Sequence, residues 1–266
     1  MDYAIYVPSF GSSLGDPSVL VSLAVEAEAS GWDGFFMWDH LVAEPLVADP
    51  WVTLGAVAAR TSRLRLGPLV TSLGRRRPWK VALEASTLQR LSGGRLVLGV
   101  GMGVPRDYTS FGEVSDARSR AARLTEGVEL VQELLSGEPV EHRGAVFEAS
   151  GVRFAAVDVP VWTSGIWPRK VPFLAAARAS GLFPIIQDGS GGFAVASPAQ
   201  AASMKAEFVA AGGPVDGDLA IWGGGARPSA AQVSEFADAG ATWLLLDGWK
   251  ASLPELRSYI SAGPPR

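Results

Sequence analysis

Two histidines occur in the chain, and one of them, His40, directly follows Asp39. An imidazole can give or take a proton near neutral pH, and a neighbouring carboxylate favours its charged form. Both residues come directly after Gly34–Trp38, a short apolar segment that predicts a strand. We therefore predict that His40 handles a proton and that Asp39 orients it, with a loop histidine bonded to backbone as the alternative. His142 lies in a charged run and is expected to be an exposed loop residue.

Glycines alternate at Gly99, Gly101 and Gly103, along and just beyond the apolar segment Leu96–Val100. Glycine lets a backbone approach a flat ring closely, which would suit an aromatic cofactor. A crowded barrel interior would explain the same spacing. The pattern is not the dinucleotide-binding fingerprint, because no helix follows at the required distance.

Two further segments are candidates for anion binding. Thr163–Pro168, with the sequence TSGIWP, lies between a predicted strand and a predicted helix. Backbone N–H groups and a serine hydroxyl at a helix N-terminus can bind phosphate, and an ordinary capping turn is the alternative. The second candidate is a basic cluster of Arg75, Arg76, Arg77 and Lys80. This cluster could contact an acidic cofactor or substrate, or it could be a solvated surface.

Several other classes of chemistry lack the residues that they need. The 266 residues contain no Cys, no HExxH motif, no G-x-S-x-G motif and no Walker loop. We therefore predict no metal site and expect a cofactor to carry the chemistry. A net charge of −4 argues against a nucleic-acid binder. No apolar run reaches the roughly 18 residues of a membrane span, and no signal peptide is recognisable, so we expect a cytoplasmic protein with no membrane contact.

Strand-like and helix-like segments alternate along the whole chain, eight of each. This alternation predicts one α/β domain over residues 1–266, folded as a single (β/α)8 TIM barrel. The expected strands are Tyr3–Pro8, Gly34–Trp38, Leu64–Val70, Leu96–Val100, Pro160–Thr163, Leu182–Ile186, Leu219–Trp222 and Thr242–Leu246. The expected helices are Pro17–Ser30, Pro50–Thr61, Pro78–Leu91, Ala117–Leu135, Pro172–Ala179, Pro198–Ala211, Ala230–Ala239 and Leu253–Ser261. The irregular stretch 136–159 is expected to contain a hairpin.

The active site of such a barrel lies at the carboxyl ends of its strands, here called the mouth. That rule selects glycines, aromatic residues and few ionisable groups, which suits a flat, partly apolar cofactor. The selected residues include Asp39, His40, Thr71, Gly101, Met102, Gly103, Ser164, Gly165, Ile166, Trp222 and Asp247.

The stretch 61–103, TSRLRLGPLVTSLGRRRPWKVALEASTLQRLSGGRLVLGVGMG, closely resembles the luciferase-like monooxygenase family. Its most diagnostic part is Leu-Ser-Gly-Gly-Arg-Leu-x-Leu-Gly-Val-Gly at 91–101. The resemblance also covers WDH at 38–40 and VPVWTSGIWP at 159–168, and it fades after about residue 190. Members of this family use reduced FMN or the deazaflavin F420, so the resemblance implies an oxidoreductase.

The resemblance also implies roles for individual residues. In the F420-using branch the matching Asp39–His40 pair sits beside the deazaflavin ring. The ring would pack against Leu69, Val70 and Thr71 on one strand end and against Gly101, Met102 and Gly103 on the next. Family members often carry a non-proline cis peptide here, expected at Leu69–Val70 or Val70–Thr71. The cofactor phosphate would lie on Ser164, Gly165, Ile166 and Trp167. One departure is Ser180-Gly181, where the family has a DG dipeptide.

The leading hypothesis is an oxidoreductase that uses F420 or FMN on a small organic substrate, by hydride transfer or by monooxygenation. The alternatives are a non-redox phosphate-binding barrel isomerase or lyase, and a flavin-binding protein without catalysis. By resemblance to its family, the protein is expected to be a homodimer.

Overall fold

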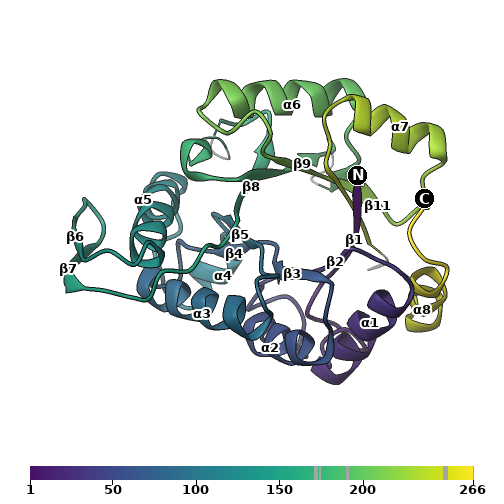
Figure 1. Ribbon diagram of the computed structural model, residues 1–266, viewed down its shortest axis with the longest axis horizontal. Helices are drawn as coiled ribbons and strands as arrows, with labels where there is room; N and C mark the ends of the chain where they lie inside the picture. The colour runs from purple at the N-terminus through teal and green to yellow at the C-terminus, as the bar shows by residue number, and fades with distance from the viewer. Residues whose placement is uncertain (171–172, 174, 190–191, 248–250, 266) are drawn as a thin grey trace.

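The computed structural model describes residues 1–170, 173, 175–189, 192–247 and 251–265 (Figure 1). Within these ranges, nine parallel strands follow one another around a barrel in the order β3-β2-β1-β12-β11-β9-β8-β5-β4. β3 and β4 are consecutive segments of one barrel strand, which pairs with β2 on one side and with β5 on the other. A parallel bridge between Leu66 and Leu96 completes the ring. The predicted TIM-barrel architecture is confirmed.

The helices lie outside the barrel, as Figure 1 shows for α1, α2, α3 and α6. The barrel strands are β1 (Asp2–Val7), β2 (Gly34–Met37), β3 (Arg65–Pro68), β4 (Thr71–Ser72), β5 (Leu98–Gly101), β8 (Val161–Trp167), β9 (Gly181–Gln187), β11 (Asp218–Gly224) and β12 (Trp243–Leu246). The helices are α1 (Pro17–Ala29), α2 (Pro50–Arg60), α3 (Pro78–Leu91), α4 (Arg106–Thr109), α5 (Ala117–Leu135), α6 (Pro198–Ala210), α7 (Ala230–Asp238) and α8 (Leu253–Ser261).

Local signals explain where the long helices begin. Asp16 and Asp49 accept hydrogen bonds from backbone N–H groups in the first turns of α1 and α2, and Pro17 and Pro50 occupy the first helical positions. A carboxylate at this position satisfies an N–H that has no partner within the helix, and proline there loses nothing by lacking its own N–H. Asp116 caps α5 in the same way. The predicted bounds of α3, α5 and α8 agree with the structure.

Large side chains fill the inside of the barrel. Trp162 and Trp243 pack on Phe36, with ring centroids 5.6 and 5.9 Å away, and Tyr6 packs edge-on against Phe183 at 5.3 Å. Strand residues alternate between this inner cluster and the outer core beneath the helices. The barrel interior is therefore a packed core, which leaves the strand ends for binding. The inner cluster comprises Ala4, Tyr6, Phe36, Leu69, Val97, Trp162, Phe183, Ala220, Trp243 and Leu245.

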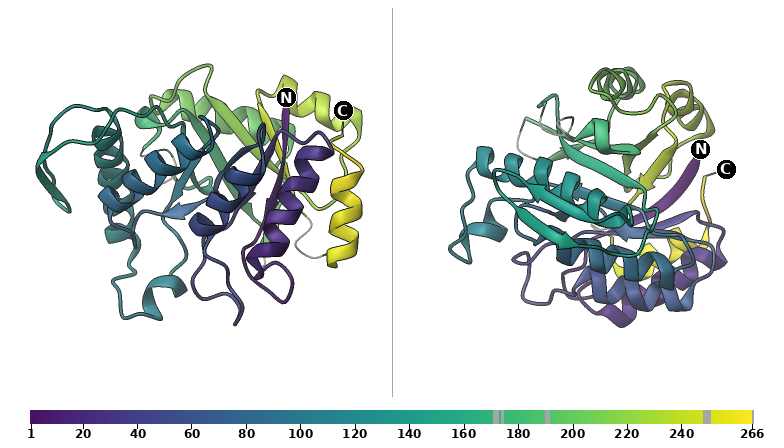
Figure 2. Two further views of the ribbon diagram at one scale, coloured as in Figure 1. Left: turned by 60° about the horizontal axis from the view of Figure 1, so that its bottom comes forward. Right: turned by 60° about the vertical axis from the view of Figure 1, so that its left-hand side comes forward.

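A two-stranded hairpin, β6 (Val140–Arg143) and β7 (Glu148–Val152), projects from the barrel beside α5 (Figures 1 and 2). The expectation of a hairpin in 136–159 is confirmed, but the expectation that His142 is exposed is wrong. The hairpin folds against α5, so His142 is buried. Its Nδ1 lies 2.9 Å from Glu133 and its Nε2 lies 3.5 Å from Glu126.

Two expectations about the chain after residue 160 also need correction. The fifth predicted strand was expected to end at Thr163, but β8 continues to Trp167 because its last residues pair with β9, where Trp167 stands opposite Ile186. The predicted helix Pro172–Ala179 falls partly outside the described residues, and its described end forms a 3-10 turn, Ala176–Arg178. A short strand, β10 (Phe193–Ala194), adds to β9 in antiparallel orientation.

Candidate active site at the barrel mouth

Asp39, directly after β2, is the most heavily bonded side chain at the mouth. Its carboxylate accepts two hydrogen bonds from Arg76, both 3.0 Å long, and one of 2.7 Å from Arg75. The Thr71 hydroxyl donates to the same carboxylate. The Asp39 side chain is only 1% exposed. These bonds hold the loop after β2 to the loop after β4 at the strand ends.

The ionisation of Asp39 follows from these contacts. Burial by itself would raise the pKa of Asp39. The charges of Arg76 and Arg75, with hydrogen bonds from Arg76 and Thr71, outweigh burial and hold the pKa below its ordinary value. The group is therefore a carboxylate at neutral pH, and its oxygens are committed to the two arginines and the threonine.

His40 has a different carboxylate partner from the one that its sequence suggests. We expected Asp39 to orient it, but the Nδ1 atom of His40 lies 3.1 Å from Oδ2 of Asp107, which is 67 residues further along the chain. The Asp39 carboxylate cannot take that role because it is turned toward Arg75 and Arg76. The His40 side chain is 27% exposed, and among the described residues no hydrogen bond engages its Nε2. One ring nitrogen is thus held and the other is left for a ligand.

Two aromatic side chains pack beside His40. The rings of Phe10 and Trp38 lie 5.8 and 5.9 Å from the imidazole, both nearly edge-on. Tyr6 stands behind Trp38 at 5.5 Å and lies deep in the barrel. Burial there raises the pKa of the Tyr6 phenol far above its ordinary value, with a smaller contribution from Asp247. The phenol therefore stays neutral, and the rings of Phe10 and Trp38 give His40 an apolar side in addition to its contact with Asp107.

The short helix α4 links three of the mouth loops and was not predicted. Tyr108 donates a hydrogen bond of 2.8 Å to the Met102 carbonyl, and its hydroxyl lies 2.6 Å from the Ser72 hydroxyl. The guanidinium of Arg120 reaches the Gly103 carbonyl at 2.8 Å. Residues 104–116 carry no apolar periodicity that would predict a helix. The available signal was Asp107 itself, a carboxylate in the loop after a barrel strand.

The alternating glycines of β5 make room for neighbouring protein. A Cβ atom on Gly99 would lie 2.6 Å from the Pro68 carbonyl oxygen, and one on Gly101 would lie 2.7 Å from Val70. Gly103 has φ +66°, and a Cβ there would meet Ser72. These contacts favour the crowded-interior explanation of the spacing. The non-proline cis peptide expected at Leu69–Val70 or Val70–Thr71 is present at Leu69–Val70.

Gly99→Ala is expected to lower the free energy of unfolding by about 1 to 3 kcal/mol, because the new methyl group meets backbone atoms that cannot move aside. The matched control is Gly55→Ala in α2, where a Cβ has nothing within 4 Å. That change should stabilise the protein by about 0.5 to 1 kcal/mol, because alanine lowers the conformational entropy of the unfolded chain. Urea titrations of both variants measure the two effects. Equal stability of the two variants would contradict the packing argument.

The segment expected to form a phosphate-binding helix terminus is a strand instead. Ser164, Gly165 and Ile166 belong to β8 and pair with residues of β9, so their backbone groups take part in the sheet. The Trp167 indole donates to Glu207 of α6 over 3.1 Å. This geometry does not support the helix N-terminus that we predicted, although these residues still lie at the carboxyl end of their strand.

The basic cluster is largely compensated by acidic partners. Arg75 and Arg76 turn inward to Asp39, and Lys80 forms an i,i+4 ion pair of 3.2 Å with Glu84. Arg77 alone extends over an aromatic ring, that of Trp79, at 6.0 Å. Most of the cluster therefore stabilises the mouth through ion pairs and does not form a free cationic surface.

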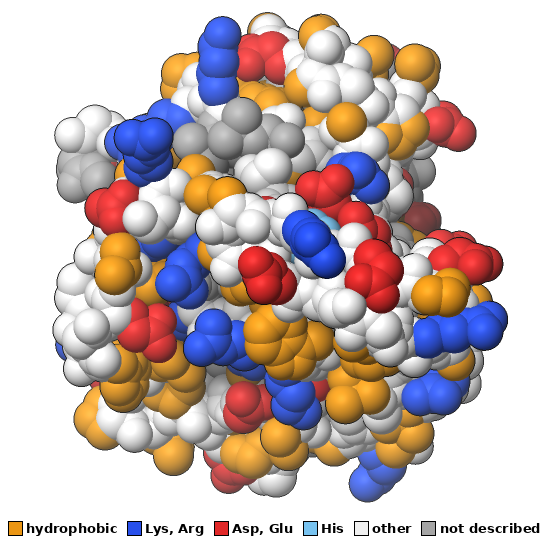
Figure 3. Space-filling view, turned by 90° about the vertical axis from the view of Figure 1, so that its left-hand side faces the viewer, with side chains coloured by type: hydrophobic (Ala, Val, Ile, Leu, Met, Phe, Trp, Pro, Cys, Tyr) orange, Lys and Arg blue, Asp and Glu red, His pale blue; other side chains and the backbone are white. Residues whose placement is uncertain are grey.

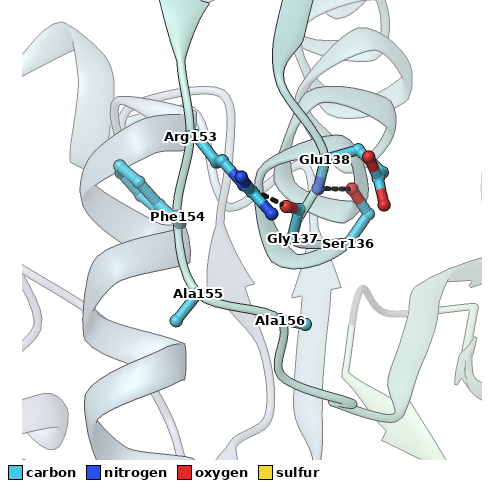
Figure 4. Close-up of a pocket in the computed structure, with 7 residues that line it drawn as sticks. All are labelled: Ser136, Gly137, Glu138, Arg153, Phe154, Ala155 and Ala156. Atoms are coloured by element: carbon cyan, nitrogen blue, oxygen red, sulfur yellow. Dashed lines mark hydrogen bonds between the residues drawn. The ribbon is translucent and has the colours of Figure 1, made fainter.

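Two surface hollows lie away from the mouth. One, of about 450 Å³, lies between the end of α5 and the chain after β7, where Arg153 donates to the Gly137 carbonyl (Figure 4). This hollow lies at the end of the barrel opposite the mouth, because the segment after β7 leads into the start of β8. The other, of about 570 Å³, lies between α5 and β6 and contains His142. Figure 3 shows acidic and basic side chains interspersed on the face that carries these elements.

No described group of three or more His, Asp or Glu side chains is arranged to hold a metal ion. None of the described helices combines the length and the apolar character that crossing a membrane requires.

A family model described as luciferase-like monooxygenase matches residues 1–242, further along the chain than the resemblance visible in the sequence. An F420-dependent glucose-6-phosphate dehydrogenase from Nakamurella multipartita is 36% identical over 178 residues, which cover 62% of this chain and 50% of that protein. A similar enzyme from Rhodococcus jostii is 38% identical over 54% of this chain and 45% of its own. The chain thus spans about half the length of the curated relatives that it matches.

Solved structures share the fold at low sequence identity. An F420-dependent secondary alcohol dehydrogenase, in complex with an F420-acetone adduct, superposes with a TM-score of 0.77 at 18% identity, over 99% of this chain and 98% of that one. The coenzyme F420-dependent tetrahydromethanopterin reductase of Methanopyrus kandleri gives a TM-score of 0.76 at 16% identity, over 98% and 96% of the two chains. The monooxygenase RslO1 from Streptomyces bottropensis gives 0.75 at 20%, again over 98% and 96%.

Proposed function

Because the chain belongs to the luciferase-like monooxygenase family, we propose that it is an oxidoreductase that binds F420 or FMN across the barrel mouth. The observation that carries this proposal is the arrangement of His40, a partly exposed imidazole beside the rings of Phe10 and Trp38, whose Nε2 has no hydrogen-bond partner among the described residues. A flat, mainly apolar ring fits such surroundings, and a single free imidazole nitrogen suits proton transfer beside it.

The residues proposed to hold the cofactor lie at four strand ends, those of β2, of the strand formed by β3 and β4, of β5 and of β8. They are Asp39, Leu69, Val70 and Thr71, then Gly101, Met102 and Gly103, and finally Ser164, Gly165, Ile166 and Trp167. When bound, F420 supplies hydride transfer at carbon 5, and reduced FMN supplies oxygen activation. In this proposal Nε2 of His40 gives or takes the proton that accompanies the reaction. The role proposed for Asp39 is to hold Arg75 and Arg76 in place at the mouth.

We favour F420 over FMN. The curated relatives at 36–38% identity are named F420-dependent enzymes, which supports this choice. The basic loop does not add support, because Arg75 and Arg76 are bonded to Asp39. The proposed substrate is a small organic molecule with apolar character, since the loops that follow the barrel strands expose large apolar side chains. These are Leu41, Leu46, Val104, Phe111, Val114, Phe193 and Val195.

The test is a fluorescence titration of the purified protein with F420 and FMN, each oxidised and reduced. Micromolar binding of F420 without binding of FMN is the expected result, and it would direct the substrate search to alcohols, ketones and enones. A preference for reduced FMN would indicate monooxygenation. Binding of neither would contradict the proposal and favour a phosphate-binding isomerase or lyase on the same barrel.

We also propose that the protein is a homodimer. Adjacent helices α2 and α3 expose apolar side chains, of which Val52 is 76%, Leu83 48% and Trp79 41% exposed. Such residues on neighbouring helices are typical of surfaces that a second copy covers. Sedimentation equilibrium would give about twice the chain mass of 27.9 kDa for a dimer.

A further inference from the structure

We propose that Asp107 is the positioning residue for His40, and that it fixes the ring as the Nδ1–H tautomer. This inference rests on the proposed function for its kinetic consequence, but its structural part stands independently. Asp107 lies in α4, after β5, and its side chain is 1% exposed. Nothing in the sequence around His40 indicates this partner.

The contacts of Asp107 all converge on the loop that carries His40. Its Oδ2 lies 3.1 Å from Nδ1 of His40. Its Oδ1 accepts hydrogen bonds from the backbone N–H groups of Leu41 at 3.2 Å and Val42 at 3.0 Å. One buried carboxylate therefore holds both the imidazole and the backbone directly after it. This arrangement fixes the ring in position and in rotation.

The chemistry of the contact sets the tautomer. A carboxylate oxygen can only accept a hydrogen bond, so Nδ1 of His40 must carry the hydrogen between them. In the neutral ring, Nε2 then has a free lone pair. Nε2 is also the nitrogen that has no protein partner among the described residues. The ring is thereby prepared to accept a proton, or a hydrogen bond, from a molecule bound at the mouth.

The support behind Asp107 is rigid. The next residue, Tyr108, is buried and bonds to the Met102 carbonyl and to the Ser72 hydroxyl. The guanidinium of Arg120 lies 5.7 Å from the Tyr108 ring. The helix that presents Asp107 is thus fastened to the ends of β4 and β5, and through Asp107 to the loop after β2. Positioning residues act well only when their own side chains are locked in this way.

The decisive variant is Asp107→Asn. An asparagine keeps an oxygen that accepts from Leu41 and Val42, which leaves its NH₂ group facing Nδ1 of His40. An NH₂ group donates, so Nδ1 becomes the acceptor and the hydrogen moves to Nε2. The same change in the Ser-His-Asp triad of serine proteases gives the wrong tautomer and lowers kcat about 10⁴-fold with the geometry intact. We expect a fall in kcat of at least about tenfold here, with little change in cofactor affinity.

The tautomer can be read directly, because the chain has only two histidines. Ring-¹⁵N-labelled histidine gives two sets of ring signals, which His142→Gln assigns. His40 should be protonated at Nδ1 in the wild type and at Nε2 in Asp107→Asn. Unchanged ring signals in Asp107→Asn would overturn the proposal, whether or not the protein proves to bind F420 or FMN.

Kinetic measurements distinguish a role of Asp107 in positioning His40 from a role that only supports the loop. Asp238→Asn is the matched control, since it makes the same change at an exposed aspartate at the end of α7, away from the mouth. Turnover close to wild type in Asp238→Asn, with a reduced kcat and an unchanged cofactor dissociation constant in Asp107→Asn, is the expected result. A kcat in Asp107→Asn equal to the wild-type value would contradict the positioning role. Cofactor binding that fails in the wild type would contradict the proposed function and leave the ring signals to decide on Asp107.

Discussion

Replacing Asp39 with asparagine is expected to lower the free energy of unfolding by about 3 to 5 kcal/mol. The substitution removes the only carboxylate that the structure shows bonded to both Arg75 and Arg76, whose side chains are 5% and 17% exposed. Arg75 would then be left at a buried position without its counter-charge, and Arg76 would keep only its longer contact of 3.8 Å with Glu84. Breaking such a pair from one side is more damaging than never forming it, because the remaining charges still carry their desolvation penalty.

The measurement is urea or thermal unfolding of wild type, Asp39→Asn and a matched control. Asp238→Asn provides that control, since it neutralises an exposed carboxylate at the end of α7. We expect the control to stay within about 0.5 kcal/mol of wild type, as surface substitutions usually do. A loss in Asp39→Asn no larger than the loss in Asp238→Asn would show that the ion pairs contribute nothing to stability.

The pH dependence of stability provides a second test of the interaction of Asp39 with Arg75 and Arg76. The pKa of Asp39 is lower in the folded protein than in the unfolded chain, because Arg76 and Arg75 outweigh the effect of burial. Its contribution to stability is therefore fully present above the unfolded value of about 4, and it is lost as the pH falls through the folded value. The stability difference between wild type and Asp39→Asn should shrink on acidification below about pH 4. A difference that grew in acid would contradict the assigned direction.

Replacing His40 with alanine is expected to reduce turnover by about 10²- to 10⁴-fold, the usual contribution of a positioned acid or base. The reason is that the imidazole is partly exposed at the mouth and is held at Nδ1 by Asp107, while no residue that the structure describes bonds to its Nε2. Cofactor affinity should change much less, because the proposed binding surface extends over four strand ends. The measurement is the steady-state rate with F420 or FMN, whichever the protein binds, on a panel of alcohols, ketones and enones.

The matched control for this variant is the second histidine. His142→Ala removes an imidazole that belongs to β6 of the hairpin and is bonded to Glu133 on α5. It should leave turnover close to wild type while lowering stability modestly. Full turnover in His40→Ala would remove the histidine from the mechanism. A loss of turnover in His142→Ala as large as in His40→Ala would show that the assay reports folding and not chemistry.

Much of the barrel is already determined by local sequence. Helix starts follow from an N-cap carboxylate and a proline, as at Asp16-Pro17 and Asp49-Pro50, and these interactions join residues within one turn. Short apolar segments between helices predict buried strands, because both of their faces are covered in a barrel. The position of His40 at the mouth followed from the same pattern, since a residue directly after a parallel strand must lie at its carboxyl end.

The tertiary structure decided which groups meet at the mouth. His40 is bonded to Asp107, 67 residues away, and its neighbour Asp39 turns instead to Arg75 and Arg76. Adjacent residues after a strand point in different directions, so sequence proximity could not reveal which carboxylate faces the imidazole. The contacts of Gly99 and the extension of β8 depend in the same way on a neighbouring strand that is distant in sequence. Local propensity fixes the elements and their ends, whereas partner choice at the site depends on how those elements pack around the closed barrel.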